Sequence, residues 1–524
     1  MEPPVVACHG FPHAAVSSID PLASQAALTV LRRGGSSVDA AIAANAVLAV
    51  VAPDACGLGG DVVGLVYQPR TPRTPPRVHA LVGIGRAGSN ANAEILREQG
   101  FRTIPRDHPA AITVPGAVDG WLLAHERFGR LALDTILADA IDYARNGFAA
   151  PARLAAGARE LSDLGFRSEL TAAFKGRFVP GQRIRHHGIA RTLEAITRLG
   201  REGFYAGEVG AELMALTQGA LRAEDLARPQ AELVEPIAVD ALGLRMMGTP
   251  APSASFLTLG LLAALPPERP TSLTQAYLEM VDAIEQTRWL HELHYDGADV
   301  AAALAAPAPS SPPATLRRPN APDTTAIVVV DHAGGACVLV QSNANAFGTR
   351  LTTHETGVFV HSRGAVGFDL DPASPNQLGP RRRPRHTLAP LMATDPRTGT
   401  LRLVAGTMGG DRQPTVIAQV VSATLREGID PRTALARARL AETAASSGPH
   451  PGFDTHHHDG KRTWVIEDHV DPSVLGELAE RIGPLTLEPG LTTAAGVCHI
   501  AMVREHDVIS CSDPRAEDGS AIGW

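Results

Sequence analysis

A proline-rich segment that runs directly into an apolar strand constrains this chain more than any other feature. Residues 301–323 are rich in proline and alanine and hold few large apolar side chains, which predicts an exposed, poorly packed linker. Residues 325–330 are mostly β-branched, and the turn at 331–335 leads to a second apolar run at 336–340. This order predicts a β-hairpin that begins immediately after the linker.

Thr324 stands at this junction. A threonine hydroxyl is a poor nucleophile unless a base takes its proton, and the α-amino group serves as that base when the threonine is the first residue of its chain. The reference pKa of an α-amino group, about 7.7–8.0, suits this task. Maturation would then require the hydroxyl of Thr324 to attack the carbonyl of Asp323, with water cleaving the resulting ester. Taken alone, Asp-Thr-Thr before a strand is more often a simple turn.

The composition is that of a globular protein with an aliphatic core. Hydrophobic residues make up 44% of the 524 residues and aromatic residues only 4%, so Ala, Val and Leu must fill the interior. The length would allow roughly two to four domains. The net charge is −8 and the longest basic run is Arg381–Arg383, which we expect to be a solvated loop. Binding to nucleic acid needs more clustered cations, so no nucleic-acid partner is expected.

No part of the sequence predicts a membrane segment or a secretory signal. The chain lacks an apolar run of about 18 residues, and residues 1–18 show no basic region followed by an apolar one. The five cysteines form no CxxC pair and are odd in number, which favours reduced thiols. We therefore expect a cytoplasmic protein. Cys56 and Cys337 lie in apolar segments and are expected in the core.

Hydrophobic periodicity outlines the secondary structure before the junction. The expected elements are helices at 24–31 and 38–51, the second with Ser37 as its N-cap, a strand at 62–67, helices to about 128 and to 146, and a mostly helical region at 190–300 broken at 248–255. The glycines Gly57, Gly59 and Gly60 precede a strand rather than follow one, so close backbone packing is favoured over a phosphate-binding loop.

Several motifs in order resemble the γ-glutamyltransferase family over nearly the whole chain. They are the stretch at 24–61 ending in CGLGGD, TVPGAVDGW at 113–121, ELVEP at 232–236, PAPSAS at 250–255, DTTAIVVVD at 323–331, FGT at 347–349, GTMGGDRQP at 406–414 and SDPRAEDGSAIG at 512–523. The resemblance implies an α+β fold, the four-layer αββα sandwich of N-terminal-nucleophile hydrolases. It also implies self-cleavage between Asp323 and Thr324 into a large subunit, 1–323, and a small subunit, 324–524. The two products would form one intertwined heterodimer, which can itself pair into a dimer of heterodimers.

The same resemblance assigns catalytic roles residue by residue. Thr324 matches the nucleophile, and Ser342 matches the hydroxyl that hydrogen-bonds its amine. Gly409 and Gly410 match the glycine pair whose backbone N–H groups form the oxyanion hole, a type of contact worth on the order of 10²–10³ in rate. The resemblance implies no cofactor and no metal.

Substrate recognition departs from the family pattern. Arg86 falls near the arginine that binds a substrate carboxylate, which a guanidinium fork suits well. His386 and Thr387 stand where relatives carry a Ser-Ser pair, and the family's Asp that holds an α-amino group is absent from HSRGAVGFD, unless Asp369 replaces it. The remaining candidates for substrate contacts are Arg363, Asn343 and Asn345. A substrate carboxylate is therefore expected, whereas an α-amino group on the acyl donor is doubtful.

The pattern predicts an amidohydrolase or acyltransferase acting on a γ-glutamyl or another short carboxylate-bearing amide such as oxamate. This pattern resembles the divergent cytoplasmic branch of the family, which includes oxamate amidohydrolase and cephalosporin-acylase-like members. Two alternatives stay open: hydrolysis of an activated C–C bond of the oxalyl type, and an inactive, unprocessed homologue, which Ala326 favours because glutathione-using relatives place His there.

Other polar clusters have simpler explanations. His456–His458 predicts a solvated loop rather than a metal site, because consecutive residues rarely converge on one ion. His291 and His294 lack the spacing of a zinc-protease motif and are expected on a helix face. Asp513, before a proline, is expected to form a turn.

Overall fold

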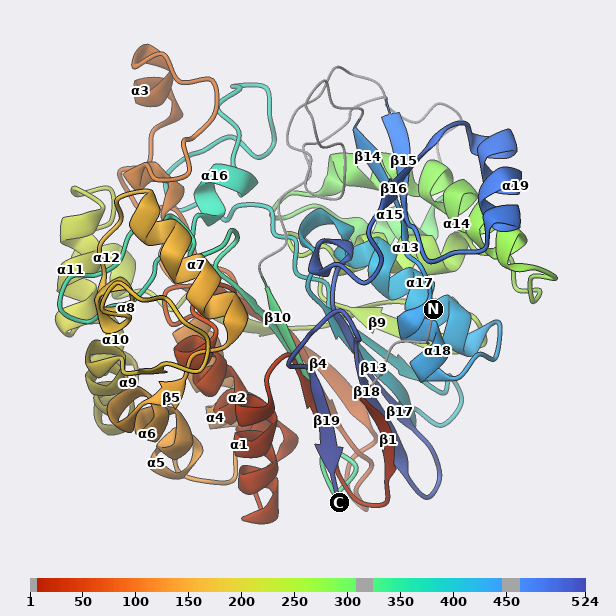
Figure 1. Ribbon diagram of the computed structural model, residues 1–524, viewed down its shortest axis with the longest axis horizontal. Coiled ribbons are helices and arrows are strands. Elements are labelled where there is room, and N and C mark those ends of the chain that lie inside the picture. The colour runs from red at the N-terminus through yellow and green to blue at the C-terminus, as the bar shows by residue number, and fades with distance from the viewer. Residues whose placement is uncertain (1–6, 308–323, 445–461) are drawn as a thin grey trace.

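The computed structural model describes residues 7–307, 324–444 and 462–524. Two antiparallel sheets of seven strands face each other in the centre, and helices cover the outer face of each sheet (Figure 1). This arrangement is the predicted αββα sandwich. Both sheets take strands from before residue 323 and from after residue 324, so the two segments are intertwined.

The first sheet holds the predicted hairpin at its centre. Its strands, in spatial order, are β19 (Ser520–Gly523), β2 (Ala15–Ser18), β10 (Thr325–Val330), β11 (Ala336–Ser342), β3 (Asp61–Gln68), β4 (Arg77–Gly83) and β7 (Ala231–Val234). Strand β10 pairs with β11 in the register Thr325 to Gln341, and the turn is closed by Asp331, whose Oδ1 accepts the N–H groups of Ala333 and Gly335. The predicted hairpin is confirmed.

The second sheet packs against the first. Its strands, in spatial order, are β1 (Cys8–Phe11), β18 (Val508–Ser512), β17 (Cys498–Val503), β13 (Leu401–Thr407), β12 (Leu391–Thr394), β9 (Leu244–Gly248) and β8 (Ile237–Ala241). Aliphatic side chains from the facing sides of the two sheets, such as Val328 and Val404, form one buried layer between them. The smaller sheets are β14 (Leu440–Ala444), β15 (Arg462–Glu467) and β16 (Leu485–Glu488), and the pair β5 (Phe148–Ala149) and β6 (Arg183–Ile184).

Two helical layers complete the sandwich. Helices α2 and α4 pack on the first sheet, and helices α13 and α17 pack on the second. The α-helices are α1 (Pro21–Arg32), α2 (Ser37–Val51), α3 (Ala93–Glu98), α4 (Ala117–Phe128), α5 (Leu133–Ile136), α6 (Ala138–Asn146), α7 (Ala152–Asp163), α8 (Glu169–Ala173), α9 (His187–Leu199), α10 (Arg201–Tyr205), α11 (Glu208–Leu216), α12 (Ala223–Leu226), α13 (Ser255–Ala264), α14 (Leu273–Thr287), α15 (Val300–Ala305), α16 (Arg363–Gly367), α17 (Gln413–Leu425), α18 (Pro431–Ala436) and α19 (Pro472–Ile482). The 3₁₀ helices are η1 (Pro109–Ala111), η2 (Arg288–Leu293), η3 (Gly410–Arg412) and η4 (Thr493–Ala495).

Helix α2 is buried on every side. Its N-cap is Ser36, whose hydroxyl accepts the N–H of Asp39 while the Asp39 carboxylate accepts the N–H of Ser36. The predicted cap at Ser37 was wrong by one residue, because both residues are serine and only the reciprocal bond with Asp39 distinguishes them. A helix that is apolar all round needs cover on all sides, and α2 lies between the first sheet and α1, α4 and α6.

The predicted helical region at 190–300 was wrong in part. Residues 231–248 form β7, β8 and β9, which extend both central sheets at one edge. The side chains along these strands are half-buried or exposed at many positions, so the segment lacks a strong two-residue alternation. The sequence signal for an edge strand was therefore weak.

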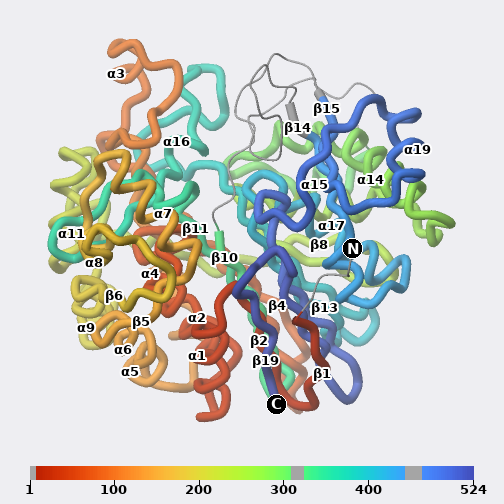
Figure 2. Tube along the Cα trace, viewed as in Figure 1, coloured from red at the N-terminus to blue at the C-terminus, as the bar shows by residue number. Residues whose placement is uncertain are grey.

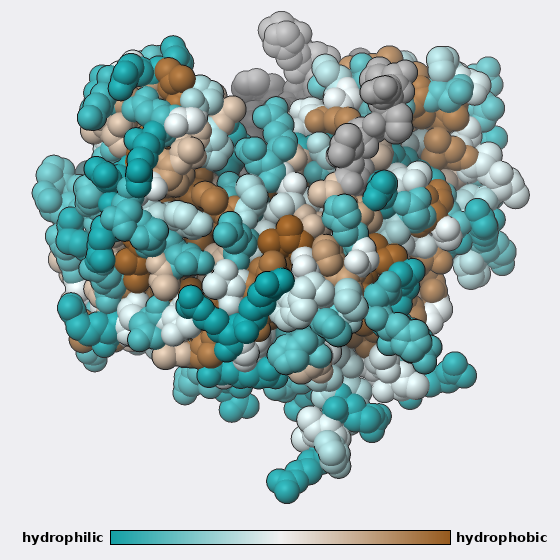
Figure 3. Space-filling model, turned by 60° about the horizontal axis from the view of Figure 1, so that its bottom comes forward, coloured by the Kyte–Doolittle hydropathy of each residue, from teal (hydrophilic) through white to brown (hydrophobic). Residues whose placement is uncertain are grey.

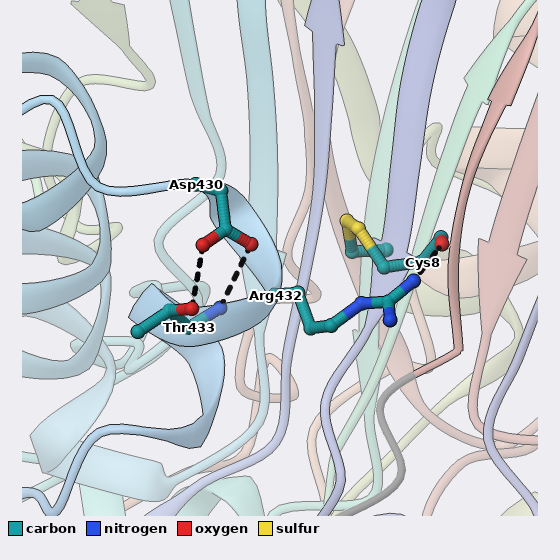
Figure 4. Close-up of a disulfide and its surroundings, with 5 residues drawn as sticks. Cys8, Asp430, Arg432 and Thr433 are labelled. Atoms are coloured by element: carbon teal, nitrogen blue, oxygen red, sulfur yellow. Dashed lines mark hydrogen bonds between the residues drawn. A yellow bond between two sulfur atoms is a disulfide. The ribbon is translucent and has the colours of Figure 1, made fainter.

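The beginning and the end of the chain meet in the sandwich. Strand β19 pairs with β2 in the first sheet, and β1 pairs with β18 in the second (Figure 2). Cys8 and Cys511 are direct partners across β1 and β18 and form a disulfide (Figure 4). The carbonyl of Cys8 also accepts a bond from Arg432 at 2.9 Å. The prediction that all five thiols are reduced was therefore wrong for this pair.

The other three cysteines are buried thiols, as predicted for Cys56 and Cys337. Burial raises the pKa of Cys56 to about 12, so this thiol is protonated at neutral pH.

On the face shown in Figure 3, apolar residues lie in small groups among hydrophilic ones. In the part of the chain that the structure describes, no helix is long and apolar enough to cross a membrane.

Candidate functional site

Thr324 is held at the mouth of the central hairpin. It directly precedes β10, is 1% exposed, and its Oγ1 donates a hydrogen bond to Oγ of Ser342 at 3.1 Å. Ser342 ends β11, and its Oγ also accepts the N–H of Ala344 at 2.9 Å. Because Thr325 pairs with Gln341, the hairpin register itself brings these two hydroxyls together. The structure thus joins two predicted site residues that are 18 positions apart.

Gly409 and Gly410 follow β13, which packs across from β10. A Cβ atom on Gly406 would lie 3.1 Å from that of Ala326, so the end of β13 sits against the start of β10. Gly409 has a φ of 139° and Gly410 a φ of 56°, conformations that side-chain-bearing residues rarely adopt. The backbone N–H groups at this turn therefore depend on glycine.

Asp61 is a member of the site that the sequence interpretation missed. It pairs with Ser342 across β3 and β11, and its Oδ1 accepts the N–H groups of Gly85 and Gly116, each at 3.0 Å. Its Oδ2 lies 3.3 Å from Nδ1 of His361 and 3.3 Å from Nε2 of His386. The available signal was a single carboxylate at the start of an otherwise apolar strand, directly after the glycine run.

The charge of Asp61 is set by its neighbours. Burial is the largest influence and would raise the pKa of Asp61, but His361 and His386 together hold this pKa below its usual range. The carboxyl group is therefore an anion at neutral pH. A fully buried anion is stable only when it is paired and hydrogen-bonded. The two N–H groups bond Oδ1, and the two histidine rings lie 3.3 Å from Oδ2, which has no hydrogen bond among the described residues.

His386 is neutral and rigidly placed. Burial, with Arg363 adding to the effect, lowers the pKa of His386 to about 3. Its backbone N–H donates to the carbonyl of Pro252 at 2.7 Å, and His294 Nε2 lies 3.0 Å from the carbonyls of both residues. His294 is thus buried against this loop at the C-cap of η2, and the predicted position on a helix face was wrong for it.

The PAPSAS segment holds the same loop from the other side. The hydroxyl of Ser253 donates to the carbonyl of Leu388 at 2.8 Å, and that of Ser255 donates to the carbonyl of Pro390 at 2.9 Å. The backbone N–H of Ala254 also donates to Leu388. Thr387, one of the predicted substrate contacts, is buried within this braced loop.

Arg363 is a buried cation beside Asp61. Its side chain is 1% exposed, and its Nε and Nη2 atoms have no hydrogen-bond partner among the described residues. Burial lowers the pKa of Arg363 to about 10, while Asp61 and Asp411 oppose that shift. The guanidinium is therefore charged at neutral pH. Asp411, which follows Gly410, lies 3.5 Å from Arg385.

Arg86 lies in the loop after β4, in a different set of charges. Its backbone N–H donates to Gln230 at 3.0 Å, and its half-buried guanidinium has Arg383, Asp296 and Glu232 as its charged neighbours. Burial and Arg383 lower the pKa of Arg86. The structure thus separates the electrostatic surroundings of Arg86 from those of Arg363.

The remaining predicted contacts have structural partners. Asn343 is buried and donates from Nδ2 to the carbonyl of Pro53 at 3.1 Å, and Asn345 donates to Oγ of Ser362 at 2.8 Å. Asp369 is exposed and accepts a bond from Ser374. Asp369 therefore has no contact that would mark it as a replacement for the missing family Asp.

Two further predictions concern charged residues. Arg383 is buried, pairs with Glu232 and donates from Nε to the carbonyl of Ile84 at 2.9 Å, so the predicted solvated loop was wrong for this residue, whereas Arg382 is exposed. Asp513 forms the predicted turn, since its carbonyl accepts the N–H of Ala516 at 3.1 Å and its Oδ1 accepts the N–H of Arg515 at 3.0 Å. Its carboxylate is also buried and pairs with Arg439 and Arg515, which ties the C-terminal segment to β14 and β15. Charge density in the sequence did not reveal this burial, because each partner comes from a distant segment.

Two predicted features lie outside the described residues, namely Asp323 and the His456–His458 run. The described residues contain no cluster of three or more His, Cys, Asp or Glu that could hold a metal ion.

The close glycine packing of the first motif is confirmed. A Cβ on Gly59 would lie 2.2 Å from the carbonyl oxygen of Phe359, and one on Gly60 would lie 2.6 Å from that of Ser342. The glycines let the backbone before β3 press against the end of β11.

Comparison with known proteins identifies this arrangement. The family model described as gamma-glutamyltranspeptidase matches residues 23–292 and 286–523. The chain belongs to the γ-glutamyltranspeptidase family. It is an enzyme of this kind, with the fold of an N-terminal-nucleophile hydrolase.

Individual relatives cover nearly the whole chain. A glutathione hydrolase-like proenzyme of Bacillus subtilis is 30% identical over 96% of this chain and 97% of its own length. The oxamate amidohydrolase proenzyme of Klebsiella pneumoniae is 31% identical over 96% of this chain and 97% of its own. The crystal structure of a cephalosporin acylase from Bacillus halodurans superposes with a TM-score of 0.84 at 25% identity, covering 99% of this chain and 97% of that one.

Proposed function

We propose that this γ-glutamyltranspeptidase-family enzyme cleaves itself before Thr324 and then hydrolyses a short, carboxylate-bearing amide through an ester on Thr324. The observation that carries the proposal is the buried hydrogen bond from the Thr324 hydroxyl to Ser342, at the start of the central strand of the sandwich. A nucleophile must be held rigidly and within reach of a base, and this position supplies the first requirement.

Self-cleavage would supply the base. The Thr324 hydroxyl attacks the Asp323 carbonyl, the C–N bond breaks as the acyl group moves to oxygen, and water hydrolyses the ester. The new α-amino group of Thr324 then lies on the same residue as the hydroxyl whose proton it must accept. Ser342 holds that hydroxyl in place and fixes its rotamer.

The same groups support turnover. The Thr324 oxygen attacks the substrate carbonyl, its proton passes through the α-amine to the leaving nitrogen, and the substrate C–N bond breaks. Water then attacks the ester and releases the acid, while an amine acceptor in place of water would give acyl transfer. The N–H groups at Gly409 and Gly410 would stabilise the negative oxygen in both steps, a contribution on the order of 10²–10³ in rate.

A reducing denaturing gel and N-terminal sequencing test the proposal. The wild-type chain should give two bands, and the smaller should begin at Thr324. Thr324→Ala should remain one band near 54.9 kDa and have no amidase activity, whereas Thr324→Ser should still cleave. Thr325→Ala is the matched control, because Thr325 is also buried at the start of β10 but donates its hydroxyl to the carbonyl of Gln341.

Activity is measured with oxamate, glutathione and a γ-glutamyl anilide. Fully active protein whose only N-terminus precedes residue 324, or full activity in Thr324→Ala, would contradict the proposal.

A further inference from the structure

We infer that the Nε–Nη2 edge of Arg363, and not Arg86, binds the carboxylate of the acyl donor. We also infer that the site around Arg363 selects a carboxylate without a neighbouring ammonium group. The inference deepens the proposed function and rests on it, because it names the anchor and the charge pattern of the substrate at the same site. Three features of the site support it: the open donor edge, the lack of a direct ion pair with the described residues, and the surroundings of the nearby carboxylates.

The first feature is the open donor edge. Nε and Nη2 carry two parallel N–H groups along one edge of the planar guanidinium, and such an edge binds the two oxygens of a carboxylate. Both atoms of Arg363 are buried and lack a hydrogen-bond partner in the described part of the chain. A buried cation with unused donors is costly, so an occupant that accepts two hydrogen bonds is expected.

The second feature is the lack of a direct ion pair. Asp61 lies 3.3 Å from the rings of His361 and His386, and Asp411 lies 3.5 Å from Arg385. Both carboxylates act on Arg363 electrostatically, but among the described residues neither lies within 4.0 Å of its guanidinium nitrogens. A substrate carboxylate would therefore be the direct ion-pair partner of Arg363.

The third feature is selection against an ammonium group. An α-amino group needs a carboxylate with free acceptor oxygens, and Asp61 and Asp411 are the two carboxylates that act on Arg363. Oδ1 of Asp61 accepts two backbone N–H groups, Oδ2 lies 3.3 Å from the rings of His361 and His386, and Asp411 lies 3.5 Å from Arg385. An ammonium group placed beside Arg363 would meet its positive charge, while both nearby carboxylates already face other polar groups.

Position places this edge at the reaction site. Arg363 interacts with Asp61, the strand partner of Ser342, and with Asp411, which follows the glycine turn. Ser362, the preceding residue, donates its N–H to the carbonyl of Asn343 at 3.0 Å, next to Ser342. Arg363 thus lies between the hairpin that carries Thr324 and the turn at 409–410. Arg86 does not share these neighbours, since the charged groups that act on it are Arg383, Asp296 and Glu232.

Titration of the purified wild-type enzyme with glutarate, followed by calorimetry, tests the inference without turnover. Glutarate should bind with a Kd below about 10 mM, and L-glutamate at least about tenfold more weakly. Arg363→Lys keeps a positive charge but loses the planar fork and should raise the Kd for glutarate at least about tenfold. Arg363→Gln should abolish binding.

Two controls separate anchoring from structure. Arg426→Lys replaces another arginine with a buried side chain, which pairs with Glu279. This variant should keep the wild-type Kd and thermal unfolding temperature. Arg86→Lys tests the alternative that Arg86 binds the carboxylate. Loss of glutarate binding in Arg86→Lys with retention in Arg363→Lys overturns the inference, as does absence of binding to the wild type or equal affinity for L-glutamate.

Failure of this inference is distinguishable from failure of the proposed function. A wild-type chain that cleaves and hydrolyses amides but binds glutarate independently of Arg363 retains Thr324 as nucleophile and loses Arg363 as anchor. A chain that never cleaves but binds glutarate through Arg363 has the opposite result.

Discussion

Asp61 and Ser342 are direct partners on the adjacent strands β3 and β11. The residue with the buried carboxylate therefore lies beside the residue whose hydroxyl accepts the hydrogen bond of Thr324. Through Oδ1 the carboxylate fixes Gly85 and Gly116, and through Oδ2 it faces His361 and His386. One side chain therefore connects the strand that ends at Ser342, the loop that leads to Arg86 and the loop that carries His386.

Replacing Asp61 with Asn should destabilise the fold by about 3–5 kcal/mol, because it leaves the buried guanidinium of Arg363 without this neighbouring anion. The folded-state pKa of Asp61 is depressed, so its stabilisation is present above the ordinary carboxyl pKa of 3.8 and is lost as pH falls below that value. Urea unfolding at pH 7 and at lower pH measures both effects. Asp134→Asn on the exposed surface of α5 is the control and should change stability far less. A wild-type unfolding curve for Asp61→Asn would show that this carboxylate does not hold the surrounding loops together.

Ser342 should matter for rate more than for folding. Ser342→Ala removes the acceptor for the Thr324 hydroxyl, and loss of one neutral hydrogen bond should slow self-cleavage about tenfold. Ser342→Thr keeps the hydroxyl and should cleave at close to the wild-type rate. Band intensities on a reducing denaturing gel over time give the rates. Equal rates in both variants would show that Ser342 does not position the nucleophile.

The hairpin of β10 and β11 was predictable because its signals are local. The β-branched run, the Asp331 turn and the second apolar run all lie close together in the sequence, and the hairpin register then brings Ser342 to Thr324. The αββα fold was predicted from the resemblance of several motifs to the γ-glutamyltransferase family. The glycines of one such motif also mark a close backbone contact, Gly59 against Phe359.

The charged network could not be read in the same way. Asp61, His361 and His386 come from three separate segments, and only the folded chain brings both histidines to 3.3 Å from the carboxylate. Residues 231–248 were misassigned because edge strands are only half-buried, which weakens the two-residue alternation. The missing information in both cases is tertiary, and no window along the sequence contains it.

Gly409 offers a test of the glycine turn. Its φ of 139° disfavours any side chain, although the nearest atom to an added Cβ would be 3.4 Å away, so Gly409→Ala should fold with local strain and without a clash. If the N–H groups of this turn stabilise the reacting oxygen, kcat should fall on the order of 10²–10³. Gly428→Ala is the matched control, since Gly428 also has a positive φ but lies on the exposed surface after α17. Similar kcat losses in both variants would assign the effect to strain alone.

The Cys8–Cys511 disulfide should link the two products of self-cleavage, because one cysteine precedes Thr324 and the other follows it. Without reductant, cleaved protein should run as one band near 54.9 kDa, and with reductant as two. Cys511→Ala should give two bands under both conditions. Two bands for unreduced, alkylated wild-type protein would show that these thiols are not joined in the isolated enzyme.

His186 should make the fold sensitive to acid. It is buried, stacks on Phe148 and has its pKa lowered to about 4, chiefly by burial. The folded state therefore resists protonation while the unfolded chain binds a proton near the ordinary histidine pKa of 6.5. Its contribution to stability is complete above about pH 6.5 and is lost as pH falls toward 4, on the order of 3 kcal/mol in all.

His186→Phe keeps a flat ring and should flatten the dependence of unfolding free energy on pH between about 6.5 and 4. Urea unfolding at a series of pH values measures that slope. His332→Phe, on the exposed turn after β10, is the control and should keep the wild-type slope. An unchanged slope in His186→Phe would mean that other groups carry the acid sensitivity of this fold.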